Sequence, residues 1–313
     1  MLPLGYGGSI FIWRPDMKVL SFGSLNIDYV YSLDHFVEKG ETITAAARHV
    51  FPGGKGLNQS IALKRAGCDV YHAGCVGCDD SALLISTLEK DGIPTKYIIQ
   101  KNVPSGHAII QKDKDGDNCI IIFGGANQKI AMEDIDTVLA EFGQGDWIVL
   151  QNEVSNMPYI ITEAKNKGMT VVLNPSPFSS EILSWPLEYV DWLILNEVEA
   201  AAFSAESNPD TIDDYIDSLR MAGIKSNILL TLGEEGSVYD DGAERIQQGI
   251  YKTKAVDTTA AGDTYTGFFI ASLLSGCSVK EAMDIAARAS AIAVSRAGAS
   301  PSIPYLNELN VEM

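Results

Sequence analysis

The chain has 313 residues, 46% of them hydrophobic and 20% charged, and its formal net charge is −18 at pH 7. This size allows one large domain with a substantial core, and the acidic excess without a basic stripe argues against a nucleic-acid-binding protein. No apolar run reaches transmembrane length, and five cysteines without a second CxxC indicate reduced thiols. We therefore expect a cytoplasmic protein without membrane or nucleic-acid partners.

The first 16 residues lack the basic start and the cleavage pattern of an export signal. Met17 directly precedes a strand-like segment, so we interpret 1–16 as an extension, native or vector-derived, outside the main domain. We expect that domain to cover 17–304, with a C-terminal tail at 305–313.

From Met17 onward, short β-rich segments alternate with helical ones. The pattern predicts strands at 18–23, 70–76, 146–151, 170–174, 192–195 and 227–231. It predicts helices at 57–66, 81–90, 157–166, 197–204, 211–222, 264–274 and 279–296. This alternation is typical of an α/β fold in which helices cover both faces of a mostly parallel sheet.

The interval 95–124 interrupts the alternation, because it contains strand-like segments without a helix. Asp115-Gly116 favours a hairpin there, and a further strand-like segment at 42–51 precedes the first helix. We expect the strands from about 41–51 and 95–124 to form a small β-sheet lid over the carboxyl ends of the main strands. Asp241-Gly242 predicts a second hairpin between 236–240 and 244–250.

Small residues and a glycine in the segment VDTTAAGDT, at 256–264, lead into an apolar helix. Backbone amides at such a helix start attract a phosphate. Asp263 would repel that phosphate, so its natural role is to take a proton from an attacking hydroxyl group. On this segment alone, a simple helix cap explains Asp263 equally well.

A second glycine-rich segment, FPGGKGLNQ at 51–59, has neither Walker nor Rossmann spacing. Gly53 and Gly54 permit close backbone approach, and the Asn58 amide can both donate to and accept from a polyhydroxylated ligand. The alternative is an ordinary turn with a solvated Lys55.

Polar residues also follow other predicted strands. Asn26 and Asp28 come after the first strand, at the ligand-facing edge of a parallel sheet, where they suit vicinal hydroxyl groups or a plain polar turn. Asn196 and Glu199 fit either a capping box or the surroundings of a hydrated Mg²⁺.

Thr231 and Gly233 end another strand and could contact a nucleotide phosphate. Taken together, these strand ends indicate phosphoryl transfer to a small polyol.

GGKGLNQ and DTTAAGDTYTGFF resemble the two signatures of the ribokinase family, the PfkB-type carbohydrate kinases, and the resemblance covers about 17–304. It implies a ribokinase-like α/β domain with a lid that closes over the sugar, and a homodimer formed through that lid. It also implies transfer from ATP, with Mg²⁺ and K⁺, to the primary hydroxyl of a small sugar, foremost D-ribose.

The resemblance assigns roles to individual residues. Asp263 would be the catalytic base, and the amides of Ala260, Ala261 and Gly262 would bind the transferring phosphoryl group. The implied sugar contacts are Asn26, Asp28, Gly54, Lys55, Asn58, Glu153 and Asp263 itself. The implied nucleotide contacts are Asn196, Thr231 and Gly233, with Glu199 supporting Mg²⁺ through water. The implied monovalent-cation site comprises Asp257, Thr259, Ala293, Arg296, Gly298 and Ser302.

Some positions depart from the usual family residues: Leu57, Ser60, Lys64 and the pair Tyr265-Thr266. None removes a catalytic group, but they leave the sugar open, so kinases for deoxyribose, fructose or a nucleoside remain alternatives. A non-catalytic sugar-binding regulator is disfavoured because Asp263 and its small-residue loop are intact.

Overall fold

The computed structural model describes residues 5–6, 9–10, 17–115, 117–203 and 211–310. Gly116, in the predicted hairpin turn, and most of the N-terminal extension lie outside these ranges. Within the extension, β1 (Gly5–Tyr6) and β2 (Ser9–Ile10) form a small antiparallel pair.

A 9-stranded sheet forms the body, in the order β15-β14-β13-β12-β11-β10-β3-β6-β7. The strands from β13 to β7 run parallel, and β14 and β15 are antiparallel additions at one edge. Their bounds are β3 (Val19–Phe22), β6 (Val70–Gly77), β7 (Tyr97–Lys101), β10 (Trp147–Gln151), β11 (Thr170–Asn174), β12 (Trp192–Asn196), β13 (Asn227–Thr231), β14 (Ser237–Asp240) and β15 (Arg245–Gln248). The predicted mostly parallel sheet and second hairpin are confirmed.

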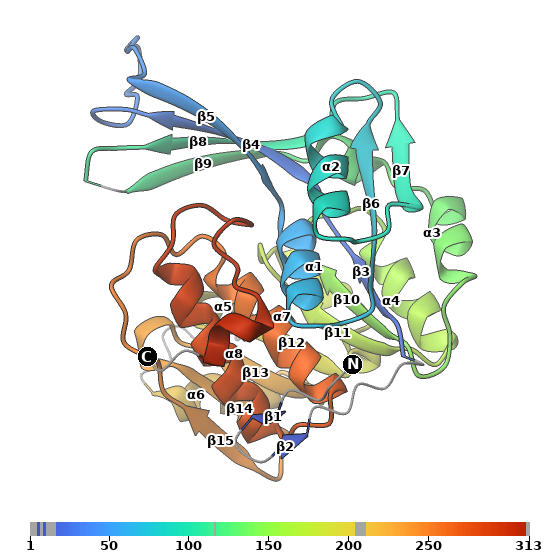
Figure 1. The fold of residues 1–313 in the computed structure, drawn as a ribbon. Helices are drawn as coiled ribbons and strands as arrows, with labels where there is room; N and C mark the ends of the chain where they lie inside the picture. The colour runs from blue at the N-terminus through green and yellow to red at the C-terminus, as the bar shows by residue number, and fades with distance from the viewer. Residues whose placement is uncertain (1–4, 7–8, 11–16, 116, 204–210, 311–313) are drawn as a thin grey trace.

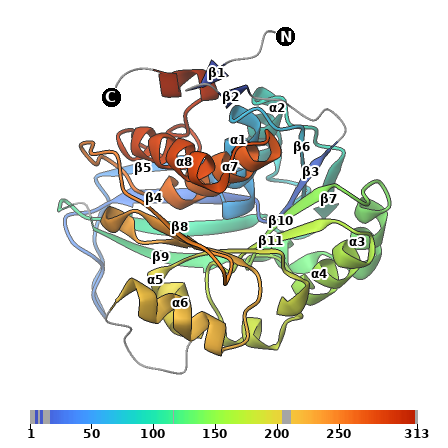
Figure 2. The same ribbon diagram turned by 90° about the horizontal axis from the view of Figure 1, so that it is seen from below.

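Helices cover both faces of this sheet (Figure 2). One layer contains α1 (Lys55–Arg65), α2 (Ala82–Lys90), α7 (Ala261–Leu274) and α8 (Val279–Val294); the other contains α3 (Met132–Leu139), α4 (Met157–Asn166), α5 (Glu197–Phe203) and α6 (Ile212–Met221). Strand side chains alternate between the layers, so Val149 joins the first core while Ile148 and Leu150 join the second. Both faces of the central strands are therefore apolar.

A 4-stranded sheet projects from the body as the lid (Figure 1). Its order is β5-β4-β8-β9, with β4 (Asn26–Ser32), β5 (Ala47–Gly53), β8 (Gly106–Lys112) and β9 (Asn118–Phe123). Two differences from the sequence-based expectation arise here. Strand β4 was not predicted as a lid strand, and β7, inside the interval 95–124, pairs with β6 in the main sheet. That interval thus supplies only β8 and β9 to the lid.

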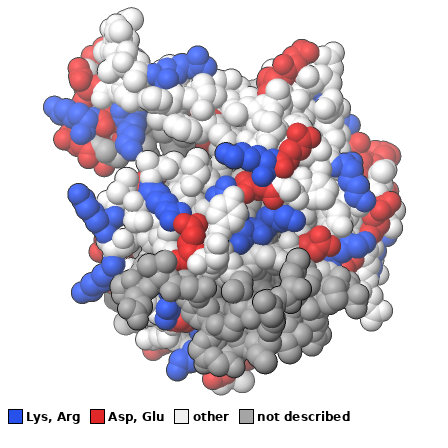
Figure 3. Space-filling view, viewed as in Figure 1, with Lys and Arg blue, Asp and Glu red and all other residues white. Residues whose placement is uncertain are grey.

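The short helix α3 was also missed, because eight residues give little helical periodicity. Five 3-10 helices complete the described structure: Gly125–Lys129, Ser180–Ser184, Leu187–Tyr189, Gly233–Glu235 and Leu306–Asn310. None of the helices in the described ranges combines the length and apolar character that crossing a bilayer demands. On the face shown in Figure 3, basic and acidic side chains of the described residues are interspersed.

Candidate active site

Four neighbouring strands of the main sheet end in polar residues at one level. Gln151 of β10 is in register with Asn174 of β11, and Asn196 of β12 is in register with Thr231 of β13. Since the carboxyl ends of parallel strands meet at one edge, Asn174, Asn196 and Thr231 form a polar floor under the lid, and Gln151 is buried beside them. The starts of α1 and α7 border this floor and bring the two glycine-rich segments together.

Asp263, the third residue of α7, lies at the centre of this arrangement and is only 6% exposed. Its Oδ2 accepts a hydrogen bond from Asn58 Nδ2 at 3.0 Å, and its Oδ1 accepts one from Gln59 Nε2 at 2.9 Å. The carboxylate does not cap its own helix. Two amides of α1 therefore hold Asp263, which argues against the simple helix cap considered from the sequence.

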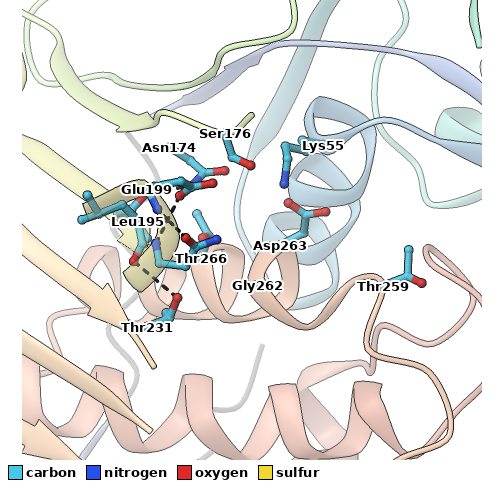
Figure 4. Close-up of a pocket in the computed structure, with 12 residues that line it drawn as sticks. Lys55, Asn174, Ser176, Leu195, Glu199, Thr231, Thr259, Gly262, Asp263 and Thr266 are labelled. Atoms are coloured by element: carbon cyan, nitrogen blue, oxygen red, sulfur yellow. Dashed lines mark hydrogen bonds between the residues drawn. The ribbon is translucent and has the colours of Figure 1, made fainter. Parts of the chain in front are cut away.

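Electrostatics around Asp263 oppose one another. Burial raises the pKa of Asp263, while Lys55 and the hydrogen bonds from Gln59 and Asn58 lower it. Figure 4 shows the Lys55 ammonium group directed toward the Asp263 carboxylate. Burial prevails, so the pKa of Asp263 lies above its usual value, and the ionised carboxylate is a correspondingly stronger proton acceptor.

The start of α7 offers free backbone donors to the same space. Among contacts between described residues, the amides of Ala260 and Gly262 make no hydrogen bond, whereas the Ala261 amide donates to Thr258 O at 3.2 Å. A cavity of about 80 Å³ lies at this helix start and is lined by Lys55, Gly262 and Asp263. Two of the three predicted phosphoryl-binding amides are thus available in this conformation.

Beneath the lid, Asp28 and Glu153 form an acidic pair. Burial and the nearby Glu153 raise the pKa of Asp28 to about 7. Burial also raises the pKa of Glu153, against hydrogen bonds that its Oε2 accepts from Ser24 Oγ and, at 2.9 Å, from the Lys55 amide. Both carboxylates lie where the sequence predicts sugar contacts, but the contribution of Ser24 was not anticipated.

The remaining predicted sugar contacts have defined local supports. Asn26 Oδ1 accepts a hydrogen bond from Asn127 Nδ2 at 2.8 Å, and Asn127 was missed because it lies in a short 3-10 helix without a motif. Gly54 precedes α1 with φ of 95°, and a Cβ there would stand 3.0 Å from Ser24 O. Asn58 Oδ1 is buried without a partner in the described structure, leaving one acceptor for a ligand hydroxyl.

Asn196 and Glu199 form a reciprocal cap at the start of α5. Asn196 Oδ1 accepts from the Glu199 amide at 2.8 Å, and Glu199 Oε2 accepts from the Asn196 amide at 3.1 Å. Both residues also line the 80 Å³ cavity beside Asp263. The described residues contain no cluster of three metal-ligating side chains. A single buried carboxylate fits Mg²⁺, which commonly keeps several waters and binds substrate phosphates.

A second cavity, of about 700 Å³, adjoins the first along α8. Asn196, Thr231 and Gly262 line both cavities, and Gly233 lines the second one alone. Elsewhere its wall includes the apolar residues Ile250 and Val294. This combination of a polar end and an apolar wall suits a nucleotide.

Five residues of the predicted monovalent-cation site lie on two loops that contact each other, and the sixth, Ala293, lies in the last turn of α8. The amides of Val256 and Asp257 donate to Val294 O, at 2.8 and 3.2 Å. Asp257 Oδ2 accepts from the Gly298 amide at 3.1 Å. The Arg296 side chain instead pairs with Glu308 at 2.6 Å, so its guanidinium is directed to the C-terminal segment.

Two departures from the family pattern have structural explanations. Leu57 is fully buried in the core, where its side chain packs with the α7 layer. Ser60 forms a 2.7 Å hydrogen bond with His72 Nδ1 and also donates to Gly56 O. Neither side chain lines the two cavities described above.

A lid over a mostly parallel sheet, with a buried carboxylate at a helix start beside a nucleotide-sized cavity, defines a phosphotransferase of the α/β class. Residues 16–306 match the pfkB family of carbohydrate kinases. The chain belongs to this family, and it is therefore a phosphotransferase with an alcohol group as acceptor.

The relatives include a ribokinase from Staphylococcus aureus (strain COL), 34% identical over 94% of this chain and 98% of its own length. The crystal structure of a ribokinase from Thermotoga maritima is similar with a TM-score of 0.82 and 37% identity, covering 94% of this chain and 97% of that one. The structure of an Arabidopsis thaliana ribokinase complexed with ribose and ATP has a TM-score of 0.81 and 29% identity, covering 94% and 97%. The fold and the kinase assignment are thereby confirmed.

Proposed function

We propose that this protein transfers the γ-phosphoryl group of ATP to the primary hydroxyl of D-ribose, giving ribose 5-phosphate and ADP. The observation that carries the proposal is the buried Asp263 carboxylate, which lies between hydroxyl-binding side chains under the lid and the free amides at the start of α7. The ribose and ATP named for the Arabidopsis relative support the same pair of substrates.

In the proposed reaction, Asp263 accepts the proton of the primary hydroxyl as the sugar oxygen attacks the γ-phosphorus. The bond from phosphorus to the β–γ bridging oxygen breaks, and ADP leaves with that electron pair. The amides of Gly262 and Ala260 and the Lys55 ammonium group stabilise the charge on the transferring group. Closure of the lid excludes water, which would otherwise compete as acceptor.

Two metal ions belong to the proposal. Mg²⁺ would neutralise charge on the nucleotide phosphates, with Glu199 and Asn196 holding it through water. K⁺ would lie between the loops that carry Asp257 and Gly298, which are already joined by a hydrogen bond. An ion there would order the segment that leads into Ala260.

A neutral pentose suits the pocket, because only Lys55 among the predicted sugar contacts carries a positive charge. A panel of ribose, deoxyribose, fructose and nucleosides with ATP, scored by ADP release, tests the assignment. A buried polar group left without its partner costs about 1–3 kcal/mol, so deoxyribose should show a kcat/KM roughly 5–150-fold below that of ribose. Faster phosphorylation of another acceptor would overturn the choice of ribose but keep the kinase.

We also propose that two chains associate through their lids. Strand β9 leaves Ile121, Ile122 and Phe123 at least half exposed, an apolar surface that a second lid would cover. An Ile121→Lys variant should then sediment as a monomer, whereas Met221→Lys, at an 80% exposed position on α6, should sediment like the unchanged protein. A monomeric unchanged protein at micromolar concentration would refute the dimer.

A further inference from the structure

Gln59 follows Asn58 on α1, and both side chains reach Asp263, yet the two are placed differently. Asn58 uses one amide atom for Asp263 and keeps Oδ1 without a partner. Gln59 is fully buried and uses both ends of its amide inside the protein. Its Nε2 donates to Asp263 Oδ1 at 2.9 Å and, at 3.3 Å, to Asn174 Oδ1 at the end of β11. Its Oε1 accepts from Gln151 Nε2 at 2.7 Å. Gln59 therefore has no free group for a sugar.

The orientation of the Gln59 amide is imposed from the main sheet. Gln151 ends β10, is fully buried, and donates to Gln59. The Gln151 Oε1 atom has no hydrogen-bond partner in the described structure and lies against Gly23, where an added Cβ would stand 1.9 Å from it. An ionised carboxylate only accepts hydrogen bonds, so Asp263 fixes the direction of the whole series: Gln151 donates to Gln59, and Gln59 donates to Asp263.

The close packing of α1 and α7 keeps these distances short. One helical turn after Asp263, a Cβ on Gly267 would stand 2.4 Å from Ala62 Cβ, so the two helices touch at that point. Asp263 lies in the first turn of α7, next to the segment that would accommodate the nucleotide. A carboxylate bound on one oxygen by Asn58 alone could rotate about its terminal bond, which has a broad torsional preference.

We propose that Gln59, oriented by Gln151, is a positioning residue that fixes the rotation of the Asp263 carboxylate and so holds one of its oxygens toward the sugar hydroxyl. The inference rests on the proposed function of Asp263 as the base. In this proposal Gln59 acts on the reaction through Asp263, its shorter contact, while its longer hydrogen bond to Asn174 anchors the amide to β11. The fully buried side chain touches neither sugar nor nucleotide.

The proposal has an electrostatic consequence for the base. The charged groups facing Asp263 are Lys55 at the start of α1 and Glu153 after β10, while Glu199 of α5 lines the same cavity. The hydrogen bond from Gln59 stabilises the ionised carboxylate and lowers its pKa. Loss of this donor should therefore raise the pKa of Asp263 and move the acid limb of the pH–rate profile to higher pH.

Gln59→Met tests the role, because it removes both amide ends at similar volume. We would measure the single-turnover rate at saturating ribose and ATP across pH. A misdirected reacting group costs up to about 100-fold, so we expect a rate at pH 7 roughly 10- to 100-fold lower. We expect the acid limb to shift up by about one pH unit and the ribose Kd to stay within about threefold. An unchanged rate and pH profile, or a ribose Kd that weakens as much as the rate, would overturn the proposal.

Gln151 provides the second variant, which also carries the test should Gln59→Met fail to fold. Gln151→Met removes the group that orients Gln59 and should reproduce the same profile with a smaller loss, about 3- to 10-fold. Because both residues act through one hydrogen bond to Asp263, the double variant should be no slower than Gln59→Met alone. If the fold-losses in rate of the two single variants multiply in the double variant, Gln59 and Gln151 act independently and the proposal is refuted.

Ser60→Ala is the matched control, since it removes a buried hydrogen bond from the next residue of α1 without touching Asp263. It should lower the melting temperature and leave the pH profile of the rate unchanged. A shifted pH–rate profile in Ser60→Ala would mean that losing any buried hydrogen bond on α1 disturbs Asp263. That result would refute a specific role for Gln59. If the unchanged protein phosphorylates no sugar, the proposed function fails. If the protein is an active kinase but Gln59→Met does not change its rate or pH profile, only the role of Gln59 fails.

Discussion

The Asp28 carboxylate of β4 lies over the Cα atom of Gly53 in β5, so close that a Cβ at position 53 would stand 2.0 Å from Asp28 Oδ2. The absence of a side chain at Gly53 therefore creates the space that Asp28 occupies. Because Gly53 ends the lid strand next to β4, this contact couples the backbone of the lid to a predicted sugar contact.

Gly53→Ala should weaken ribose binding by displacing Asp28. Losing hydrogen bonds to a charged group costs about 1.5–3 kcal/mol, so we expect the ribose Kd to rise roughly 10- to 100-fold. Titration calorimetry without nucleotide measures it directly. Gly143→Ala is the control, because a Cβ there meets nothing closer than 4.0 Å. Equal ribose affinity in the two variants would contradict the predicted role of Asp28.

Ribose binding should also depend on pH through Asp28. Its pKa is raised to about 7, so the carboxylate ionises as the pH rises through neutrality and only then accepts hydroxyl groups as a charged acceptor. If the ionised form alone binds, the ribose Kd should be about tenfold lower at pH 8 than at pH 6. Asp28→Asn should bind more weakly and lose this dependence. A pH-independent Kd in the unchanged protein would rule out the titration of Asp28.

The same shift predicts a change in stability. In the folded protein Asp28 holds its proton up to about pH 7, whereas in the unfolded chain it releases it near its usual value. The unfolded state therefore binds fewer protons between these values, and this group lowers the free energy of unfolding as pH rises from about 4 to 7. A pKa of about 7 in place of the usual 3.8 corresponds to about 4 kcal/mol, so Asp28→Asn should be more stable than the unchanged protein by about that amount at pH 8 and equal to it near pH 3. Urea unfolding at the two pH values checks the difference, and equal stability at pH 8 would contradict it.

Asp263→Asn should lower kcat by about 10²- to 10⁴-fold, because an amide cannot take the proton of the hydroxyl group. Ribose binding should be largely kept, since the other predicted sugar contacts remain. Steady-state kinetics and calorimetry on the same preparation separate the two effects. A folded variant with near-normal turnover would show that Asp263 is not the base.

Potassium should activate the enzyme through the loops that Asp257 and Gly298 join. Replacing K⁺ by tetramethylammonium at equal ionic strength should lower kcat/KM at least about 5-fold, the lower end of usual coupling between sites. Asp257→Ala should be insensitive to the exchange, because the carboxylate that accepts from the Gly298 amide is gone. Equal kcat/KM in both salts would remove K⁺ from the proposal.

Local sequence patterns were enough to predict the α/β class and the two glycine-rich segments that carry the site. Periodic burial within each segment is a local property, so β10, β11 and β13 were placed within a residue or two. The segment from Val256 to Thr264 likewise marked Asp263, because a carboxylate among small residues at a helix start has few roles.

Strand pairing and contacts between distant side chains could not be predicted in this way. A β-rich segment does not specify its neighbour, so β7 joined the main sheet and β4 became a lid strand against expectation. Gln59 stood inside a recognised motif, yet its partner Asp263 is 204 residues away. Local sequence patterns indicate whether a residue is buried. A hydrogen bond between residues so far apart in the sequence depends instead on how the helices pack on the sheet, and this packing defines the surroundings of the candidate base.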